Sequence, residues 1–597
     1  MKLRVADYII GRLAAEGVKN IFQVTGRGAL FLNDAVAKSE LVNGISMHHE
    51  QACAFAAIAA SEQQKNIGVC LVSTGCASTN TITGVLCAWQ DGIPLVVISG
   101  QNFLRETRRF TKKNVRTFGQ QEADIIELVE PITKYARMLE KAEDIVKILE
   151  EAIIEAKSGR KGPVFIDVPL DLQSSLIEIE SDFPRPVKYD RPEALEIPGI
   201  AKLQEMLRNS TRPTLLIGKG IALSSTEQQL RELSEKHSIP VTYATSAPDT
   251  YGLKNNNSIG SVGAMGCSRA GNFAIQNSDL IIVLGSRLTA LTTGPEFCKF
   301  GRDAKIVVVD IDPDEHSKDG VEIDLFIEAD LTDFFNQLLR NSSETVFKKW
   351  LSQCLKWKAL FSEIEIPFRT TSEIDLYQLC KSLSKTVPSN TTILTDSGLN
   401  EVIIPSNMAF SDSVNCIHSA SQGAMGFALP ASIGAQLAKP ENLVVPIIGD
   451  GSIMMNLQEL ETIRSYDLPI KLIIINNNVY SIIRRRQTDL FRKRTIGTDP
   501  SNGVAVPDFS QIATCFGFDY MKIKDPTELD HSLLSLFEKK SRVICEIVGR
   551  EDQSYIELGF AKSQETKRFV RRPLEDQSPF LNRDLFNREM IIKPIDL

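Results

Sequence analysis

The sequence lacks several features that would place it in a broad functional class. It has no run of the ~18 uncharged apolar residues that a membrane-spanning helix needs, and its longest apolar runs, such as Leu472 to Ile475, have the length of a strand. The net charge of −8 argues against a nucleic-acid-binding protein, because such proteins usually carry a basic surface. The first residues contain no apolar signal region, because Arg4, Asp7 and Arg12 interrupt them. We therefore expect a soluble globular protein.

The cysteines also lack the spacing of a zinc site or of a disulfide framework. The 11 cysteines are scattered, and none forms a Cys-x-x-Cys pair. An odd number of isolated cysteines is typical of reduced thiols in the cytoplasm. The sequence therefore predicts a cytoplasmic protein without structural zinc.

Length and patterning predict several domains of one fold class. At 597 residues the chain is too long for one hydrophobic core, and about three or four domains are expected. Short apolar runs that end in Gly, Pro, Asp or Asn alternate with helical patterns, which is typical of parallel sheets covered on both faces. The predicted fold class is α/β, with three successive doubly wound parallel-sheet domains and a C-terminal tail. The expected ranges are 1–176, 197–343, 371–548 and, for the tail, 549–597.

Two polar corners at the ends of predicted strands give the strongest chemical signal. One strand ends in Gly449, Asp450, Gly451 and Ser452, and the next ends at Asn477, with a helical crossover between them. One βαβ unit brings both strand ends to the same edge of a sheet. A carboxylate and a carboxamide that meet there suit a hard cation such as Mg²⁺, and the glycines allow backbone N–H groups to approach a phosphate. Two ordinary strand–turn–helix corners are the alternative.

Glu50 is a second candidate. It ends an apparent strand and starts an Ala-rich helix, QACAFAAIAA. A carboxyl group at this place can share a proton with a ligand, or it can simply interact with the helix dipole. Glu50 alone leaves both interpretations open.

The chain around these residues resembles a known superfamily. From Gly17 to Gln101 the order of VKNIFQVTGRGALFLNDAV, HHEQACAFAA, STGCASTNTITG and QDGIPLVVISGQ resembles the pyrimidine-binding domain of the acetohydroxyacid synthase and pyruvate decarboxylase superfamily of thiamine diphosphate enzymes. The step from Asp450 to Asn477 resembles its GDG…NN motif. The resemblance covers roughly residues 3–548. It implies that Asp450 and Asn477 bind Mg²⁺ through their side chains, with the backbone carbonyl of Val479, and that catalytic Glu50 hydrogen-bonds N1′ of the aminopyrimidine.

The resemblance assigns further residues to the site. Gln121 matches a catalytic-pocket Gln, and Met425 stands where a bulky apolar residue supports the bent coenzyme, although core packing would also explain a Met. The other expected cofactor contacts follow strand ends and glycine-rich turns: Gly26, Gly75, Ser397, Gly398, Gly423, Gly449, Gly451, Ser452 and Tyr480. Because the family places the coenzyme between two subunits, the expected partner is a second copy of the chain, in a homodimer at least, with a homotetramer as the larger alternative.

The middle block raises the question of a second cofactor. With PTLLIGKG and KIVVVDIDP it resembles the domain that binds FAD in acetohydroxyacid synthases. Its LGSRLTALTTG lacks the FDDR-like run of those synthases, so the alternative is a dinucleotide-like fold without a ligand. FAD therefore stays open beside thiamine diphosphate and Mg²⁺.

The segment after Tyr480 bears on the substrate. Arg486 stands where acetohydroxyacid synthases carry Trp, and SIIRRRQT with GTDPSNGVAVPDF resembles enzymes of surface-polysaccharide and yersiniose-type branched-sugar pathways. That implies a carboligase that decarboxylates pyruvate or a similar 2-keto acid and transfers the acyl carbanion to a ketone, such as a nucleotide-linked keto sugar. Acetolactate synthase, 2-keto acid decarboxylase and a non-catalytic relative are the alternatives. Arg27, Arg484 and Arg486 are the candidate substrate contacts. For the two arginines after Tyr480 the alternative is a solvated helix face or an ion-pair cluster between subunits, and for Arg27 it is the dimer interface.

Overall fold

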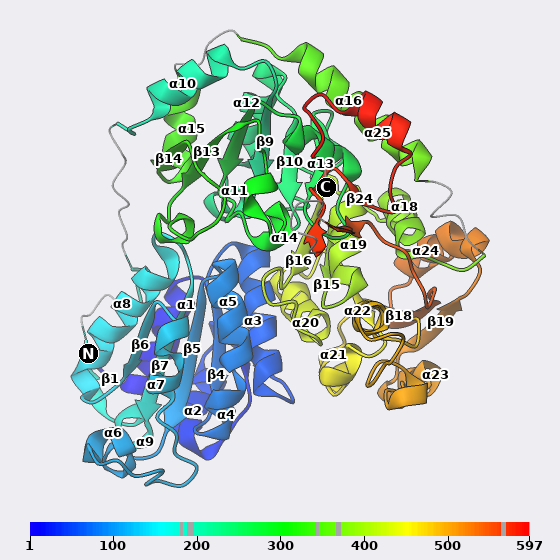
Figure 1. The fold of residues 1–597 in the computed structure, drawn as a ribbon. Helices are drawn as coiled ribbons and strands as arrows, with labels where there is room; N and C mark the ends of the chain where they lie inside the picture. The colour runs from blue at the N-terminus through cyan, green and yellow to red at the C-terminus, as the bar shows by residue number, and fades with distance from the viewer. Residues whose placement is uncertain (180–182, 188–195, 341–344, 366–371, 563–568, 596–597) are drawn as a thin grey trace.

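Three parallel sheets follow one another along the chain. The computed structural model describes residues 1–179, 183–187, 196–340, 345–365, 372–562 and 569–595. Each domain has one six-stranded sheet, and Figure 1 shows the three domains in blue, green, and yellow to orange. The predicted α/β class with three successive domains is confirmed. The domain limits stay predictions, and those at 343 and 371 lie outside the described residues, as does most of the linker before the second domain. None of the described helices is long and apolar enough to cross a membrane.

The first domain is built around a sheet whose central strands are buried along their whole length. Its strands lie in the order β3 (Asn43–Ser46), β2 (Asn20–Gln23), β4 (Gly68–Val72), β5 (Leu95–Gln101), β7 (Pro163–Pro169) and β6 (Tyr135–Met138). The helices are α1 (Val5–Ala15), α2 (Leu30–Lys38), α3 (Glu50–Gln64), α4 (Cys76–Asn80), α5 (Ile82–Asp91), α6 (Arg108–Thr111), α7 (Ile125–Val129), α8 (Ile145–Lys157) and α9 (Leu170–Gln173). A short antiparallel pair, β1 (Lys2–Arg4) and β8 (Leu176–Glu178), joins the two ends of the domain.

The middle domain has the strand order of a dinucleotide-binding fold. Its sheet reads β11 (Ser258–Val262), β10 (Val241–Ala244), β9 (Pro213–Ile217), β12 (Leu280–Leu284), β13 (Lys305–Asp310) and β14 (Leu325–Glu328). The direction of strand succession reverses between β9 and β12, and such a switch point leaves a crevice at the carboxyl ends of the strands. The helices are α10 (Ile200–Asn209), α11 (Gly220–Ser224), α12 (Glu227–His237), α13 (Arg269–Gln276), α14 (Ala290–Thr293), α15 (Leu331–Arg340) and α16 (Lys348–Ile364).

The third domain repeats the strand order of the first. Its sheet reads β16 (Val414–His418), β15 (Thr391–Thr395), β17 (Leu443–Gly449), β18 (Lys471–Asn476), β20 (Val543–Val548) and β19 (Asp519–Ile523). Its switch point lies between β15 and β17, so the loops after these strands border one crevice. The helices are α18 (Leu376–Thr386), α19 (Leu399–Asn407), α20 (Ala428–Ala438), α21 (Glu459–Ser465), α22 (Ser481–Leu490), α23 (Phe509–Phe516) and α24 (Leu529–Glu538).

The tail returns from the third domain to the middle domain. Two short antiparallel pairs form in it, β21 (Glu557–Leu558) with β24 (Gln577–Ser578), and β22 (Phe560–Lys562) with β23 (Phe569–Arg571). The last helix, α25 (Arg583–Glu589), lies along α16 (Figure 1), where Phe586 joins the middle-domain core and Trp357 Nε1 donates to Glu589 at 3.1 Å. The tail therefore links two domains.

Helices of small residues join the first and third domains. α3 and α20 pack so closely that a Cβ atom on Gly434 would lie 1.9 Å from the carbonyl oxygen of Ala56. The rings of Phe55 and Phe427 meet edge-on beside this contact, with centroids 5.1 Å apart. Both helices belong to one continuous buried cluster. The two domains therefore share a core, and only glycine fits at position 434.

Candidate active site

The two polar corners of the third domain meet as the βαβ pattern predicts. Asp450 follows β17 and Asn477 follows β18, and these strands are parallel neighbours with Gly449 beside Ile475. Both side chains line a cavity of about 270 Å³, which we call the corner cavity. Eight more of the predicted residues line it: Ser397, Gly398, Met425, Gly449, Gly451, Ser452, Val479 and Tyr480.

The carboxylate of Asp450 is held in a fixed orientation by the backbone. Its Oδ1 accepts a hydrogen bond from Gly451 N at 2.7 Å, and its Oδ2 accepts one from Asn478 N at 2.6 Å. The side chain is 3% exposed, and burial raises its pKa to about 6. A bound cation would favour the ionised form of this buried acid.

Asn477 and Val479 complete a donor set of oxygens. Asn477 Nδ2 donates to Ser481 Oγ at 2.7 Å, which orients the amide and leaves its oxygen to act as a ligand. Asp450, this amide oxygen and the Val479 carbonyl are hard oxygen donors, as Mg²⁺ prefers. No cluster of three His, Cys, Asp or Glu side chains in the described parts of the chain offers a different metal site. The residues present therefore fit Mg²⁺ and the diphosphate that it would bridge.

A buried carboxylate behind the corner cavity ties three loops together. Asp396 Oδ2 accepts hydrogen bonds from Ser452 Oγ at 2.8 Å and from Gly426 N at 3.0 Å. Its other oxygen is buried and has no hydrogen-bond partner among the described residues, and burial raises the pKa of this acid well above its ordinary range. Asp396 thus positions the Ser452 turn against the loop that carries Met425.

The glycines of the corner cavity are needed for space and for backbone conformation. A Cβ atom on Gly451 would lie 2.0 Å from Cε1 of Tyr480, so the ring packs directly on the backbone of Gly451. Gly398 has a φ value of +102°, a conformation that L side chains rarely adopt. The predicted cofactor contact Gly423 also has a positive φ, +55°, but it does not line the cavity. A Cβ atom on Gly398 would meet no neighbouring atom within 4 Å, which leaves room for a ligand beside it.

The predicted residues of the first domain gather at a different sheet edge. Glu50 is the first residue of α3, and its carboxylate accepts a hydrogen bond from Asn80 Nδ2 at 2.9 Å. Gly75, with φ +64°, lies so close to Gln121 that a Cβ atom would meet the Gln121 carbonyl oxygen at 1.8 Å.

Two more predicted residues of the first domain, Gly26 and Arg27, lie at the turn after β2; Gly26 precedes the turn and Arg27 begins it. A Cβ atom on Gly26 would lie 2.6 Å from the Ser73 side chain, and Arg27 Nη1 donates to Gln120 Oε1 at 2.8 Å. None of Gly26, Arg27, Glu50, Gly75 and Gln121 lines the corner cavity of the same chain. The chain thus carries two separate groups of candidate residues.

Sequence reasoning missed the part of the tail that borders the corner cavity. Gly549, Arg550 and Gln553 line it, and Gln553 Oε1 accepts a hydrogen bond from Leu376 N at 2.9 Å. The one sequence feature that indicates these residues is the position of Gly549, directly after the last long apolar run of the third domain, where a strand end is expected. The polar residues that follow have no periodicity from which this contact could be inferred.

Comparisons with known proteins agree with this arrangement. Residues 3–128, 200–338 and 396–547 match the N-terminal TPP binding domain, the central domain and the C-terminal TPP binding domain of thiamine pyrophosphate enzymes. The chain belongs to the thiamine pyrophosphate enzyme family. The predicted superfamily is thereby confirmed, and the protein is a thiamine diphosphate-dependent enzyme.

Relatives with a curated description resemble almost the whole chain. The acetolactate synthase large subunit of Parasynechococcus marenigrum is 30% identical over 560 residues, which cover 92% of this chain and 88% of the relative. The probable acetolactate synthase large subunit of Methanocaldococcus jannaschii is 31% identical, with 92% of each chain covered. The acetolactate synthase large subunit of Haemophilus influenzae is 29% identical, with 93% of this chain and 96% of the relative covered.

Arg484 and Arg486, both on α22 of this thiamine diphosphate enzyme, differ in their ion pairing. Arg484 pairs with Glu551 and with Asp552, the latter at 2.7 Å. Arg484 is therefore ion-paired within its own chain, whereas the expected alternative was an ion-pair cluster between subunits. Arg486 forms no ion pair with any described carboxylate, and its side chain is exposed.

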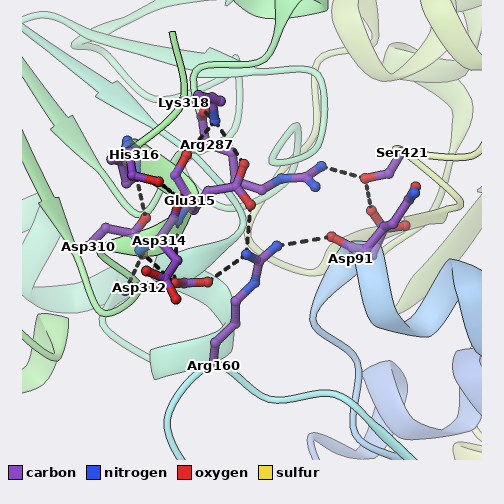
Figure 2. Close-up of polar contacts among 12 residues, drawn as sticks. Asp91, Arg160, Arg287, Asp310, Asp312, Asp314, Glu315, His316, Lys318 and Ser421 are labelled. Carbon is purple, nitrogen blue, oxygen red and sulfur yellow. Dashed lines mark hydrogen bonds and ion pairs between the residues drawn. The ribbon is translucent and has the colours of Figure 1, made fainter. Parts of the chain in front are cut away.

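The crevice of the middle domain meets the first domain at a charged rim, which Figure 2 shows. Arg160 Nη1 contacts Asp312 at 2.8 Å and Glu315 at 2.7 Å, and Arg287 donates to Ser421 Oγ at 2.5 Å. Ser421 Oγ in turn donates to Asp91 (Figure 2), so the rim joins all three domains.

The same crevice has features of a nucleotide site. A cavity of about 140 Å³ is lined by Gly220 after β9, Gly285 after β12 and Asp310 at the end of β13. Glycine turns and an acid at a switch point fit the adenosine diphosphate part of a dinucleotide. Adjoining cavities of about 860 and 900 Å³ offer room for a larger group. The residues fit the nucleotide half of FAD, and its binding stays a prediction.

Proposed function

We propose that this enzyme decarboxylates pyruvate or a similar 2-keto acid and transfers the resulting acyl unit to a carbonyl acceptor, with thiamine diphosphate and Mg²⁺. The observation that carries the proposal is the corner cavity, which Asp450, Asn477 and Val479 line beside glycine turns suited to a diphosphate. The acetolactate synthase relatives support a 2-keto acid as the substrate. Thiamine diphosphate, when bound, supplies an electron sink for loss of the carboxylate.

The chain's own residues orient the reactants and manage one proton. Asp450 and Asn477 would hold the cation. Tyr480 and the glycine turns would hold the diphosphate, and Met425 would pack against the coenzyme. Glu50 would share a proton with N1′ of the aminopyrimidine, with its carboxylate oriented by the hydrogen bond from Asn80. Gln121 beside Gly75 would border the substrate.

We propose a homodimer as the smallest active unit. Glu50 does not line the corner cavity of its own chain, so the acid of one copy would meet the coenzyme held by another. Met454 and Met455, which follow the Gly451–Ser452 turn, are 42% and 49% exposed, as is typical of an apolar contact surface. Sedimentation of the purified protein with coenzyme and Mg²⁺ tests this, and a monomer that turns over pyruvate would exclude it. A tetramer is the larger alternative.

Pyruvate-dependent CO₂ release after addition of thiamine diphosphate and Mg²⁺ is the direct test of the proposed reaction. Mass spectrometry of the products separates the acceptors: acetolactate indicates a second pyruvate, acetaldehyde indicates a proton, and a sugar adduct indicates a nucleotide-linked keto sugar. The exposed Arg486, which pairs with no described carboxylate, favours an anionic acceptor over a proton. Absence of CO₂ release from coenzyme-saturated protein would reject the proposal.

We also propose that the middle-domain crevice binds FAD. Gly220, Gly285 and Asp310 would hold its nucleotide half. The proposed carboligation has no net electron transfer, so FAD would contribute structure in this reaction. Flavin absorbance that stays with the protein on gel filtration tests the binding, and Asp310→Ala should lower the retained amount. Retention that is equal in both proteins would argue against this crevice.

A further inference from the structure

Lys161 borders the small cavity of the middle-domain crevice and both of the larger cavities that adjoin it. It belongs to the first domain, where it lies two residues before β7. Of the described residues that line the cavities of about 140, 860 and 900 Å³, it is the only one common to all three. A ligand that reaches from the small cavity into either larger one therefore passes beside Lys161.

The ammonium group of Lys161 lies at the boundary between the first and middle domains. Its Nζ donates to the carbonyl oxygen of Leu223 at 2.7 Å, and Leu223 belongs to α11, the helix that begins at Gly220. Leu223 itself lines the small cavity and the cavity of about 860 Å³. Capping of α11 is the simpler role for Lys161, and it uses one of the three N–H donors of an ammonium group.

The other cations that line the small cavity are already engaged. Arg160 contacts two carboxylates, at 2.8 and 2.7 Å (Figure 2), and Lys219 Nζ lies 2.8 Å from Glu62 Oε2. Arg287 donates to the hydroxyl of Ser421 at 2.5 Å. Two of these three cations are therefore neutralised by carboxylates, and the third is held at the charged rim.

Lys161 forms no ion pair with any carboxylate within the described ranges. Burial lowers its pKa, because the charged form loses hydration, and Asp330 opposes this effect through its charge without forming an ion pair with Lys161. The positive charges of Lys65 and Lys157 lower the pKa further. A partly buried ammonium group without an ion pair is stabilised by a bound anion.

The acids of the small cavity lie on its other side. Asp310 ends β13 and Asp330 follows β14, whereas Lys161 contacts the helix that follows β9. In the sheet, β12 separates β9 from β13. The cavity therefore has an acidic side, which suits the hydroxyl groups of a ribose, and a cationic side beside a glycine turn, which suits phosphate.

We propose that Lys161 binds the diphosphate group of the nucleotide ligand in the middle-domain crevice, an assignment that rests on the FAD site of the proposed function. A diphosphate joins the two halves of a dinucleotide, so it crosses the boundary between the small cavity and a larger one, where Lys161 lies. Two donors of the ammonium group remain for phosphate oxygens. Because Lys161 belongs to the first domain, the bound ligand also ties that domain to the middle domain.

Binding of ADP tests this assignment without turnover. Calorimetric titration at fixed ionic strength uses flavin-free protein saturated with thiamine diphosphate and Mg²⁺, so that the coenzyme's own phosphate site is filled. Lys161→Gln keeps a donor for the Leu223 carbonyl but loses the charge. It should raise the Kd for ADP about tenfold, the effect of losing one charge-assisted contact. Adenosine has no phosphate, so its Kd should be equal in the two proteins.

Two controls separate the contact from a general effect of charge or folding. Lys147→Gln removes a mostly exposed charge from α8 of the same domain and lines none of the three cavities, so the Kd for ADP should not change. In the wild-type protein, ADP should slow the acetylation of Lys161 by acetic anhydride, as mass spectrometry of the peptides measures. Adenosine should not slow it, and Lys147 in the same sample should react equally with and without ADP.

The outcomes distinguish this contact from the FAD proposal. An equal Kd for ADP in wild type and Lys161→Gln, an equal loss for adenosine, or an equal loss in Lys147→Gln would overturn the assignment, as would unprotected Lys161 in the presence of ADP. FAD and ADP that weaken by the same factor in Lys161→Gln support a dinucleotide as the ligand. ADP binding that depends on Lys161, in a wild type that retains no flavin, supports the contact for a nucleoside diphosphate and rejects only the FAD part of the proposed function.

Discussion

Protons and the divalent cation should compete for one carboxylate in the corner cavity. Burial raises the pKa of Asp450 to about 6, whereas an exposed Asp titrates near ~3.9. An acid with a raised pKa is neutral below that value, so the cation meets an ionised Asp450 only above about pH 6. At about pH 5 roughly one molecule in eleven carries the charge, and the apparent affinity for Mg²⁺ should be about tenfold lower than at about pH 8.

The raised pKa of Asp450 also makes the free energy of unfolding of the coenzyme-free protein depend on pH. Because the folded pKa of Asp450 exceeds the unfolded one, the protonated acid contributes stability below about pH 4 that is lost as the pH rises through about 6. About two pKa units correspond to about 3 kcal/mol at neutral pH and above. A bound cation offsets this loss. The rise in melting temperature on addition of Mg²⁺ and thiamine diphosphate should therefore grow between about pH 5 and about pH 8.

Calorimetric titration of Mg²⁺ at saturating thiamine diphosphate measures the effect across this pH range. Asp450→Asn is the matched variant, because its side chain keeps the shape and no longer titrates. Subtraction of the variant's profile removes the titration of the diphosphate itself. The difference should approach one decade in affinity per pH unit below about pH 6. Parallel pH profiles in the two proteins would refute the reasoning.

Two further substitutions test other parts of the structure. Glu50→Gln keeps a hydrogen-bond acceptor but cannot hold the proton, so pyruvate-dependent CO₂ release should fall by ~10²–10⁴-fold at an unchanged melting temperature; near-normal turnover would exclude the proton-sharing role. Gly434→Ala drives a methyl group against the Ala56 carbonyl, so the free energy of unfolding should fall by about 1–3 kcal/mol. Gly320→Ala, whose Cβ would have no neighbour closer than 3.7 Å, is the control in the same thermal melts, and equal melting temperatures would contradict the tight helix contact.

The local chemistry of the corner cavity was predictable because it depends on short-range rules. Apolar runs that end in Gly-Asp-Gly or Asn-Asn predict strand ends, and one right-handed crossover is enough to bring Asp450 beside Asn477. The alternation of strands and helices fixed the α/β class in the same way. These features need only the period of a strand and the direction of a crossover.

Contacts between remote segments were not predictable from such rules. Nothing in the sequence couples Gln553 to Leu376, or Arg571 to Phe560, because the tail has no hydrophobic period that reports where it docks. Arg484 was a candidate substrate contact from its residue type, and its carboxylate partners became visible only in three dimensions. Charge alone does not tell a paired arginine from an unpaired one.

The close packing of α3 on α20 has a mechanical consequence. α3 begins with Glu50, the predicted proton-sharing acid, and α20 follows the loop that carries Met425. The contact of Gly434 with Ala56 therefore couples the two separate groups of candidate residues within one chain, because neither helix can shift without disturbing this contact in the shared core. In the proposed dimer, a displacement at one coenzyme site would reach the second site through this contact.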